Sequence, residues 1–352
     1  MKILFSVGAN YLPQGTGGIQ KNTHDICNWL MLHGHQPLVI SGLIGGNKSY
    51  YINAIKRRFS RSPVVADFDC GYPVYRGWSL IDGFKWILMS EQPDCAILQS
   101  ENMSAFSKIS CDYGLDNFGY FHSTTNYDID ISRVPDFTGV FANSIFMART
   151  LEAKFGYQAN ILRPIIIAEN YFVPRTGERV IFFNPHPSKG SELMVEIARR
   201  LSHIQFDFVS PANYSWNESS EIKSTRSQVR DFGNVHWHQA CGDVRKFFAG
   251  SRLLLMPSMG FETWGRVVSE AQVSGIPVLA SDRGGLPEAV GAGGVVLSAD
   301  ATADIWCEQI SRLYNDEKAY VRLSALAFDH ARRADFQPDA MLDGFMKIVE
   351  GV

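Results

Sequence analysis

The fold of this chain follows from one stretch of sequence, Gly260-Phe261-Glu262-Thr263-Trp264-Gly265-Arg266-Val267-Val268-Ser269-Glu270. The apolar run 253–256 just before it predicts a buried strand. The apolar Val267 and Val268 predict a helix that begins near Thr263. A buried strand followed by a turn and a helix is part of the βαβ unit of an open parallel sheet. The stretch therefore predicts an α/β domain.

Two carboxylates flank the predicted start of this helix. Glu262 comes just before it and Glu270 about two turns inside it. The free N–H groups of a helix N-terminus favour a phosphate, and carboxylates are good acceptors for vicinal hydroxyls. The order matches a nucleoside diphosphate sugar, with Glu262 on the sugar and Glu270 on the ribose. On spacing alone, an N-cap-like Glu262 and a solvated Glu270 explain the pattern as well.

The rest of the chain predicts two domains of this kind. Short apolar runs alternate with helical patterns, which is typical of doubly wound parallel sheets with a ligand cleft between them. The predicted strands are 3–7, 37–41, 95–99, 118–121, 139–142, 180–183, 205–210, 235–238, 253–257 and 277–281. The expected domains are 1–165 and 178–334, joined by a linker with two prolines, and a helix at about 335–352 is expected to pack back on the first. The polar stretch 211–230 predicts an exposed, mobile loop.

Composition narrows the class of protein. The chain is 45% hydrophobic and 20% charged, which excludes wholesale disorder, and its net charge of -3 gives no field that would recruit nucleic acid. The six cysteines lie far apart, so reduced thiols in the cytoplasm are expected. No apolar run approaches the ~20 residues of a spanning helix.

The quoted stretch resembles the Glu-x7-Glu motif of the retaining glycosyltransferases of family 4, which have the GT-B fold of two Rossmann-like domains. The following segments, 270–281 and 284–291, are also similar to that family. The resemblance implies a metal-independent hexosyltransferase or related enzyme of the EC 2.4 class. It would move a sugar, with retention, from a nucleotide-sugar to a hydroxyl of a saccharide or lipid-linked acceptor. The expected setting is polysaccharide, lipopolysaccharide or glycolipid assembly.

No cofactor is expected, since the nucleotide-sugar is a substrate. The alternatives are another GT-B enzyme (a nucleotide-sugar epimerase or a phosphorylase), or a nucleotide-sugar-binding protein that has lost turnover.

The resemblance also implies the site residues. Lys189-Gly190 stands where a Lys-Gly pair binds the donor diphosphate, although Phe183-Asn184 replaces the family's usual Gly-Arg. The second cation is therefore missing or comes from Arg163, Arg266 or His186. The catalytic set comprises Glu262, His122 and Lys189. The donor-binding set comprises Gly17, Gly18, Asn184, Lys189, Glu262, Thr263, Trp264, Gly265 and Glu270, and the acceptor-side set comprises Thr16, His122 and Asn143.

Four of these residues come from turns and strand ends of the first half. The glycine-rich turn at Gly17 and Gly18 allows close approach of the backbone to phosphate. His122 ends a predicted strand, at the edge where ligands of such sheets bind. Asn143 follows the next strand, where an N-cap role is equally open.

No metal is expected. Asp67-Phe68-Asp69 and Asp128-Ile129-Asp130 would suit the metal of another glycosyltransferase architecture, but exposed acidic loops explain them better. The histidines of 236–238 lie on one strand face without a third ligand nearby, which favours a structural role.

One local asymmetry of charge stands out. No acidic residue falls between Asp25 and Asp67, while Lys48, Lys56, Arg57, Arg58 and Arg61 do. With the interleaved aromatic and aliphatic residues, the window Lys48–Arg61 could lie on anionic lipid headgroups at the inner face of the membrane. A solvated loop or helix face is the alternative.

Overall fold

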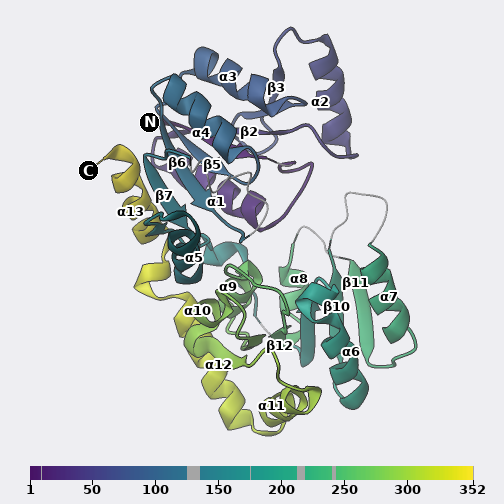
Figure 1. Cartoon of the computed structure of the whole chain (residues 1–352). Coiled ribbons are helices and arrows are strands. Elements are labelled where there is room, and N and C mark those ends of the chain that lie inside the picture. The colour runs from purple at the N-terminus through teal and green to yellow at the C-terminus, as the bar shows by residue number, and fades with distance from the viewer. Residues whose placement is uncertain (9, 125–134, 175, 212–218, 240–242, 352) are drawn as a thin grey trace. The chain divides into compact units, whose positions relative to one another are not determined.

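The computed structural model describes residues 1–8, 10–124, 135–174, 176–211, 219–239 and 243–351. These form two compact units (Figure 1). Unit 1 comprises Met1–Ile165 and Pro338–Val352, and unit 2 comprises Ile166–Gln337. Each unit is built on its own, mostly parallel sheet. The predicted α/β class is therefore confirmed.

The sheet of unit 1 has the strand order β3-β4-β2-β1-β5-β6-β7-β8 within the described residues. Only the β3–β4 pair is antiparallel among the strand pairs described there. The strands are β1 (Lys2–Val7), β2 (Gln36–Gly42), β3 (Val64–Asp67), β4 (Val74–Gly77), β5 (Cys95–Gln99), β6 (Asp116–Phe121), β7 (Gly139–Ala142) and β8 (Asn160–Ile161).

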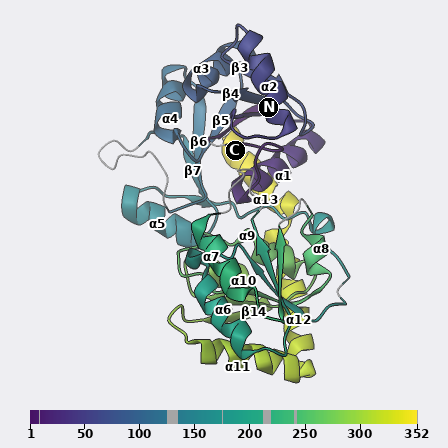
Figure 2. The same cartoon turned by 90° about the vertical axis from the view of Figure 1, so that its right-hand side faces the viewer.

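Helices cover both faces of this sheet (Figure 2). They are α1 (Gly18–Leu32), α2 (Lys48–Phe59), α3 (Leu80–Glu91), α4 (Met103–Asp112), α5 (Ile145–Phe155) and α13 (Pro338–Glu350). Apolar side chains of α3, α4 and α5 form one core with β1, β2 and β5. The last helix, α13, belongs to unit 1: Trp29 donates from Nε1 to Asp339 at 2.7 Å, and the Phe141 and Phe345 rings lie 5.2 Å apart.

The sheet of unit 2 has the order β11-β10-β9-β12-β13-β14, and its described pairs are all parallel. Its strands are β9 (Arg179–Phe183), β10 (Phe206–Ser210), β11 (Val235–Gln239), β12 (Ser251–Met256), β13 (Val278–Ser281) and β14 (Gly294–Leu297). Its helices are α6 (Ser191–Arg200), α7 (Ser220–Val229), α8 (Arg245–Phe248), α9 (Arg266–Gln272), α10 (Leu286–Val290), α11 (Ala303–Asn315) and α12 (Glu317–Ala331).

Each sheet has a point at which its strand order reverses direction. In unit 1 the strands run outward from β1 through β2, β4 and β3 on one side and from β5 to β8 on the other, and in unit 2 they run outward from β9 and from β12. At such a point the connections that follow the two neighbouring strands leave toward opposite faces of the sheet, which opens a crevice outside the carboxyl ends of these strands. Ligands of open α/β sheets bind in this crevice.

Two predictions about loops are wrong. Ser220–Val229 is the helix α7 and not part of a loop; Ser219 caps it by accepting from the Ile222 N–H at 3.3 Å. Asp67 is 6% exposed and pairs with the buried Arg76, so it is not part of an exposed acidic loop. Asp69 is exposed, and the second Asp-x-Asp triplet, 128–130, lies outside the described residues.

Candidate active site

The switch point of unit 2 brings Lys189 and Glu262 together. Lys189 follows β9, Glu262 follows β12, and β9 and β12 are neighbours in the sheet. The Lys189 Nζ donates to Oε1 of Glu262, and the same oxygen accepts from the Ser258 hydroxyl at 3.0 Å. A carboxylate and an ammonium group therefore meet at the edge where a ligand would bind.

The backbone fixes the two loops that carry this pair. The N–H groups of Met259 and Gly260 both donate to the carbonyl of Ser188, each at 3.0 Å. Gly190 adopts φ +82, and a Cβ there would lie 2.1 Å from the Pro257 carbonyl oxygen. Only glycine fits this approach, which explains the glycine of the Lys-Gly pair.

A third loop lies along the backbone of Glu262 and Thr263. Gly285 donates to the Glu262 carbonyl at 2.7 Å, and a Cβ on Gly284 would lie 2.1 Å from that oxygen. The glycines that follow β13 thus hold Glu262 in an extended conformation by a parallel bridge to Gly284.

The helix after Glu262 begins later than predicted. α9 starts at Arg266, not near Thr263. Its N-cap Gly265 has φ +86, a left-handed conformation that cannot continue a helix, and the bridge to Gly284 keeps the preceding residues extended. Glu270 consequently lies about one turn inside the helix instead of two.

Glu270 is a buried partner of Arg266. Its carboxylate accepts from Arg266 Nε at 2.8 Å, and the two side chains are 6% and 8% exposed. Arg266 also donates to the Tyr171 hydroxyl at 2.9 Å. The predicted ribose ligand and a candidate for the second donor cation are thus bound to each other.

The other residues of the predicted donor set in unit 2 have distinct places. Trp264 is 2% exposed and packs in the core, with its Nε1 donating to Ser269 at 3.0 Å, so its indole is a structural group. Asn184 follows β9 with φ +55, a left-handed conformation that asparagine adopts more readily than arginine. His186 bonds Ser188 at 2.8 Å.

In unit 1, Gly17 and Gly18 follow β1 at that unit's switch point. Gly17 is the N-cap of α1, and a Cβ on Gly18 would meet no atom within 4 Å. Thr16 beside them is exposed. Asn143 follows β7 and is 4% exposed, while Ser144 is the N-cap that accepts from the Met147 N–H at 3.0 Å.

His122 follows β6 and is tied to β5. Its Nε2 lies 2.7 Å from Oε1 of Gln99, the last residue of β5, and Gln99 also bonds Thr23 of α1. Burial lowers the pKa of His122 to about 3, so the imidazole is neutral at pH 7. With Nε2 donating to Gln99, Nδ1 carries no proton and can only accept.

The sequence analysis did not single out Gln99, Ser258 or Tyr171. It named Arg266 as a candidate cation but not as the partner of Glu270. A buried glutamine at a strand's carboxyl end, and the spacing of four between Arg266 and Glu270, were the available signals. Ser258 carried none.

Other polar clusters have structural partners. His236 bonds Gln205, and His238 bonds Asp207, each at 2.8 Å. Among the described residues no group of three or more His, Cys, Asp or Glu side chains is placed to hold a metal ion.

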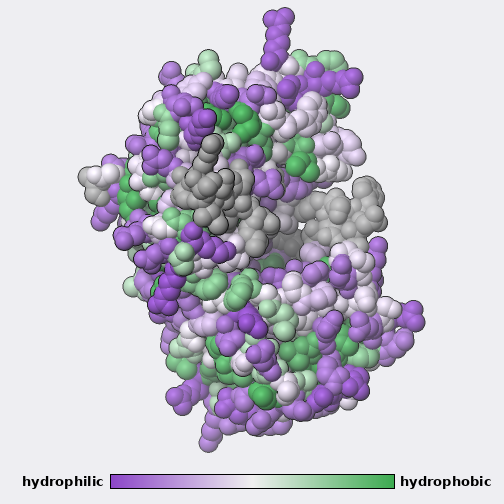
Figure 3. All heavy atoms as spheres, in the orientation of Figure 1, coloured by the Kyte–Doolittle hydropathy of each residue, from purple (hydrophilic) through white to green (hydrophobic). Residues whose placement is uncertain are grey.

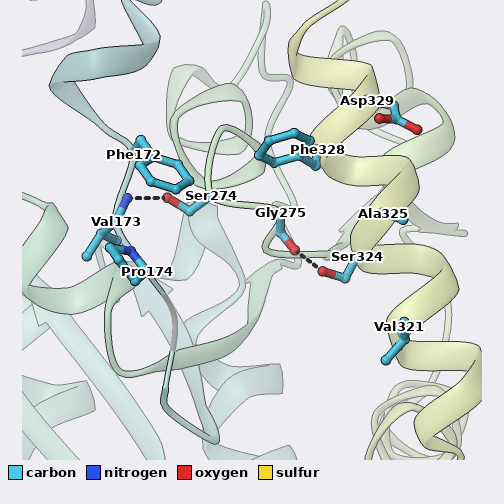
Figure 4. A pocket seen from close by; sticks show the side chains of 10 residues that line it. All are labelled: Phe172, Val173, Pro174, Ser274, Gly275, Val321, Ser324, Ala325, Phe328 and Asp329. Carbon is cyan, nitrogen blue, oxygen red and sulfur yellow. Dashed lines mark hydrogen bonds between the residues drawn. The ribbon is translucent and has the colours of Figure 1, made fainter.

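A cavity of about 430 Å³ in unit 2 lies elsewhere (Figure 4). It is lined by Phe172, Val173, Pro174, Ser274, Gly275, Val321, Ser324, Ala325, Phe328 and Asp329. Its two serines are bonded to backbone: Ser274 accepts from Val173 at 3.0 Å and Ser324 donates to Gly275 at 2.8 Å. None of the candidate site residues lines it.

Comparison with solved structures decides the fold. A glycosyltransferase from Rickettsia africae ESF-5 has a TM-score of 0.77 at 16% identity, covering 99% of this chain and 98% of that one. Anabaena Alr3699/HepE, solved in complex with UDP-glucose, has a TM-score of 0.78 at 16% identity, with 100% of both chains covered.

The fold is GT-B.

Sequence comparison matches a segment in the second half of this GT-B chain to a known family. Residues 178–316, which include Lys189, Glu262 and Glu270, match the family described as glycosyl transferases group 1. A D-inositol 3-phosphate glycosyltransferase of Paenarthrobacter aurescens (strain TC1) is 30% identical over 149 residues. That match covers 37% of this chain and 36% of the relative, so the chain spans about a third of the length of that relative.

Proposed function

We propose that this protein is a retaining glycosyltransferase that moves a sugar from a nucleotide-sugar to a hydroxyl acceptor without a metal ion. The observation that carries the proposal is the pairing of Lys189 with Glu262 at the switch point of unit 2, inside the segment that matches the glycosyl transferase family. We assign the reaction to polysaccharide, lipopolysaccharide or glycolipid assembly.

Glu262 would accept hydrogen bonds from hydroxyls of the donor sugar. Its Oε1 already accepts from Lys189 and Ser258, so its position is fixed before a sugar arrives. Gly284 and Gly285 hold the backbone behind it. The carboxylate therefore acts as an orienting group and not as a mobile base.

Lys189 would stabilise charge on the departing diphosphate. In a reaction on one face of the sugar, the acceptor oxygen bonds to the anomeric carbon as the bond from that carbon to the phosphate oxygen breaks. The acceptor proton passes to the leaving phosphate oxygen. Negative charge grows on the diphosphate in this step, and an ammonium group beside it lowers the barrier.

His122, which lies in unit 1, would supply a hydrogen-bond acceptor. Its neutral imidazole, held through Nε2 by Gln99, presents Nδ1 as an acceptor for a hydroxyl. Thr16 and Asn143 complete the proposed acceptor side, and Gly17 and Gly18 the proposed contact with the donor diphosphate. Arg266 is held by Glu270, which leaves the second cation of the diphosphate site unassigned.

Uridine diphosphate sugars are the first donors to test, because Anabaena HepE is solved with UDP-glucose. A thermal-shift screen over UDP-, GDP-, ADP- and dTDP-sugars identifies the base, since a ligand that binds only the folded state raises Tm. Transfer to a saccharide or lipid-linked acceptor is then followed with the active donor. The anomeric configuration of the product, read by NMR, and full activity in a chelator test retention and metal independence.

One observation favours a second candidate, a nucleotide-sugar-binding protein that has lost turnover. Asn184 stands where the resembled family has arginine, and its left-handed backbone is one that asparagine adopts more readily than arginine. A donor that raises Tm and is not consumed with any acceptor would support this alternative. An epimerase would instead convert the donor with no acceptor present.

The proposal includes a peripheral contact with an anionic membrane through Lys48–Arg61, which would bring a lipid-linked acceptor to the enzyme. Within the described residues no helix combines the length and apolar character needed to cross a bilayer.

A further inference from the structure

The helix α2 presents an apolar strip to solvent. Ile52, Ile55 and Phe59 are 43%, 62% and 83% exposed. At about 100° per residue these three lie within roughly 60° of each other around the helix axis. An amphipathic helix on a soluble protein ordinarily turns its apolar stripe toward the core. In α2 that orientation is reversed.

A buried polar network fixes the reversed orientation. Asn53, which is 1% exposed, lies on the opposite side of α2 and donates from Nδ2 to Asp67 at 2.9 Å. Asp67 also pairs with Arg76, whose side chain is fully buried and donates to Ser41 at 3.3 Å. Rotating α2 to bury the apolar strip would break the Asn53–Asp67 hydrogen bond and leave buried polar groups without partners, which is costly.

Cations flank the strip. Lys56 and Arg58 are exposed and fall on either side of Phe59 around the helix. Two carboxylates contact α2: Asp67 is offset by its pairing with Arg76, whereas the exposed Asp69 keeps its charge and accepts from Ser49 at 2.8 Å. The exposed face of α2 is therefore both apolar and positively charged.

An exposed tryptophan adjoins the end of the helix. Trp78 is 57% exposed, and the Arg57 guanidinium lies 5.5 Å from the centre of its ring. Arg57, a residue of α2, also donates to the Pro63 carbonyl at 2.7 Å, which fixes its guanidinium at the end of the helix. Tryptophan side chains gather at the level of lipid headgroups, where one edge is polar and the ring is apolar.

We propose that this face is a docking surface for an anionic lipid bilayer, with α2 lying in the plane of the headgroups. Ile52, Ile55 and Phe59 insert, while Lys56 and Arg58 reach the lipid phosphates. In the space-filling view, hydrophobic and hydrophilic residues lie side by side over the end of unit 1 that carries α2 (Figure 3).

The inference rests on the membrane contact included in the proposed function and assigns it to one helix face. Lipid fits this face better than a protein, because the cores of protein interfaces are depleted of lysine, whereas long cationic side chains beside an apolar strip suit a headgroup layer.

Sedimentation of the full chain with vesicles tests the proposal. The vesicles are phosphatidylcholine alone and phosphatidylcholine mixed with phosphatidylglycerol. We expect binding to the mixed vesicles that weakens with salt. Phe59→Glu should lower the partition coefficient by about tenfold or more, since it removes a large apolar side chain from the interface. The double variant Lys56→Glu, Arg58→Glu should lower it by at least about 25-fold, because each cation contributes a factor of about five.

Matched controls are available in the same unit. Leu32 is 84% exposed on α1, so Leu32→Glu also replaces an exposed apolar side chain by a carboxylate, but away from the strip. Lys85→Glu, Lys108→Glu makes the same change of charge on exposed positions of α3 and α4. Both controls should bind like the unaltered chain.

Three outcomes would overturn the proposal: equal, negligible binding to both vesicle types, equal losses in the control variants, or concentration-dependent self-association that disappears in Phe59→Glu. The last outcome would make the strip a contact between two copies of this chain. Sedimentation needs no donor, so it is independent of catalysis. A donor-induced rise in Tm, measured on the same variants, shows separately whether the proposed nucleotide-sugar site is intact.

Discussion

Lys189 and Glu262 form an ion pair although 73 residues separate them in the sequence. The pair joins the loop after β9 to the loop after β12, the two strands at which the order of the unit 2 sheet reverses. Both side chains keep some exposure, 31% for Lys189 and 14% for Glu262. A partly exposed pair contributes little to stability, about 1 kcal/mol or less, so loss of the pair should affect the proposed donor site more than the fold.

Glu262→Ala should therefore abolish transfer in a folded protein. Glu262 is proposed to orient the donor sugar by accepting hydrogen bonds from its hydroxyls, so its loss should lower kcat by about a hundredfold or more. Steady-state kinetics with the active donor measures the effect, and thermal unfolding checks that Tm changes by only a few degrees. A fully active Glu262→Ala enzyme would refute the site. Arg179→Ala, at the opposite end of β9, is the control and should leave kcat unchanged.

Glu270→Gln should destabilise the protein by about 3 kcal/mol. Arg266 and Glu270 are both nearly buried, and removal of one partner leaves the other charge uncompensated. Chemical unfolding in urea measures the loss. The exposed pair Glu196 and Arg200 has the same spacing of four residues, so Glu196→Gln should change the free energy of unfolding far less. Similar losses in the two variants would show that burial of the Arg266 pair is incomplete in solution.

Stability should fall with acid through His122. Burial lowers its pKa from 6.5 to about 3, so between these values the unfolded chain binds a proton that the folded protein does not. The contribution of neutral His122 to the free energy of unfolding is complete above pH 6.5 and is lost as pH falls toward 3. This free energy then falls by at most about 1.4 kcal/mol per pH unit. His122→Gln should flatten the dependence measured by urea unfolding at pH 7 and pH 5. His203→Gln, on an exposed residue, should not.

Gln99 should act on the reaction through His122. Gln99→Met removes the hydrogen-bond acceptor for His122 Nε2 and puts an apolar side chain of similar length in its place. We expect a roughly tenfold lower kcat with KM for the donor nearly unchanged, because the imidazole loses its fixed tautomer and orientation. Thr23→Val removes the other side-chain partner of Gln99 and should have a smaller effect. An unchanged kcat in Gln99→Met would remove Gln99 from the mechanism.

Gly190→Ala should destabilise unit 2 and disturb the Lys189 loop. The new methyl group would lie 2.1 Å from the Pro257 carbonyl oxygen, so backbone must move, and the left-handed φ of +82 adds strain. We expect a loss of about 2 kcal/mol or more. Gly156 has a similar φ of +74 but no atom within 4 Å of a new Cβ, so Gly156→Ala should cost only about 1 kcal/mol. Thermal unfolding of the two variants separates the clash from the strain.

Much of the fold could be predicted because buried parallel strands are continuous apolar runs. The predicted strands 95–99 and 139–142 match β5 and β7. The strands β3 and β4 were not predicted, since Asp67 and Arg76 make their sequences look polar. Their burial depends on the ion pair between them, which no local pattern records.

The candidate site divides in the same way. Glu262 could be singled out from its spacing to Glu270, and Lys189 from a resemblance, but their contact across 73 residues depends on the strand order, which no local sequence pattern records. The late start of α9 depends on the bridge between Glu262 and Gly284, which is a tertiary contact. The partners of Glu270 lie in two segments, and only Arg266 is close enough in sequence for its spacing to indicate the pair.

The position of α13 has a consequence for biosynthesis. Unit 2 is one continuous segment, whereas unit 1 needs residues from both ends of the chain. During translation Trp29 and Phe141 are made long before their partners Asp339 and Phe345. Unit 2 needs no residue of α13 and can therefore fold without it. The apolar surface of unit 1 that α13 covers stays open until α13 itself has emerged.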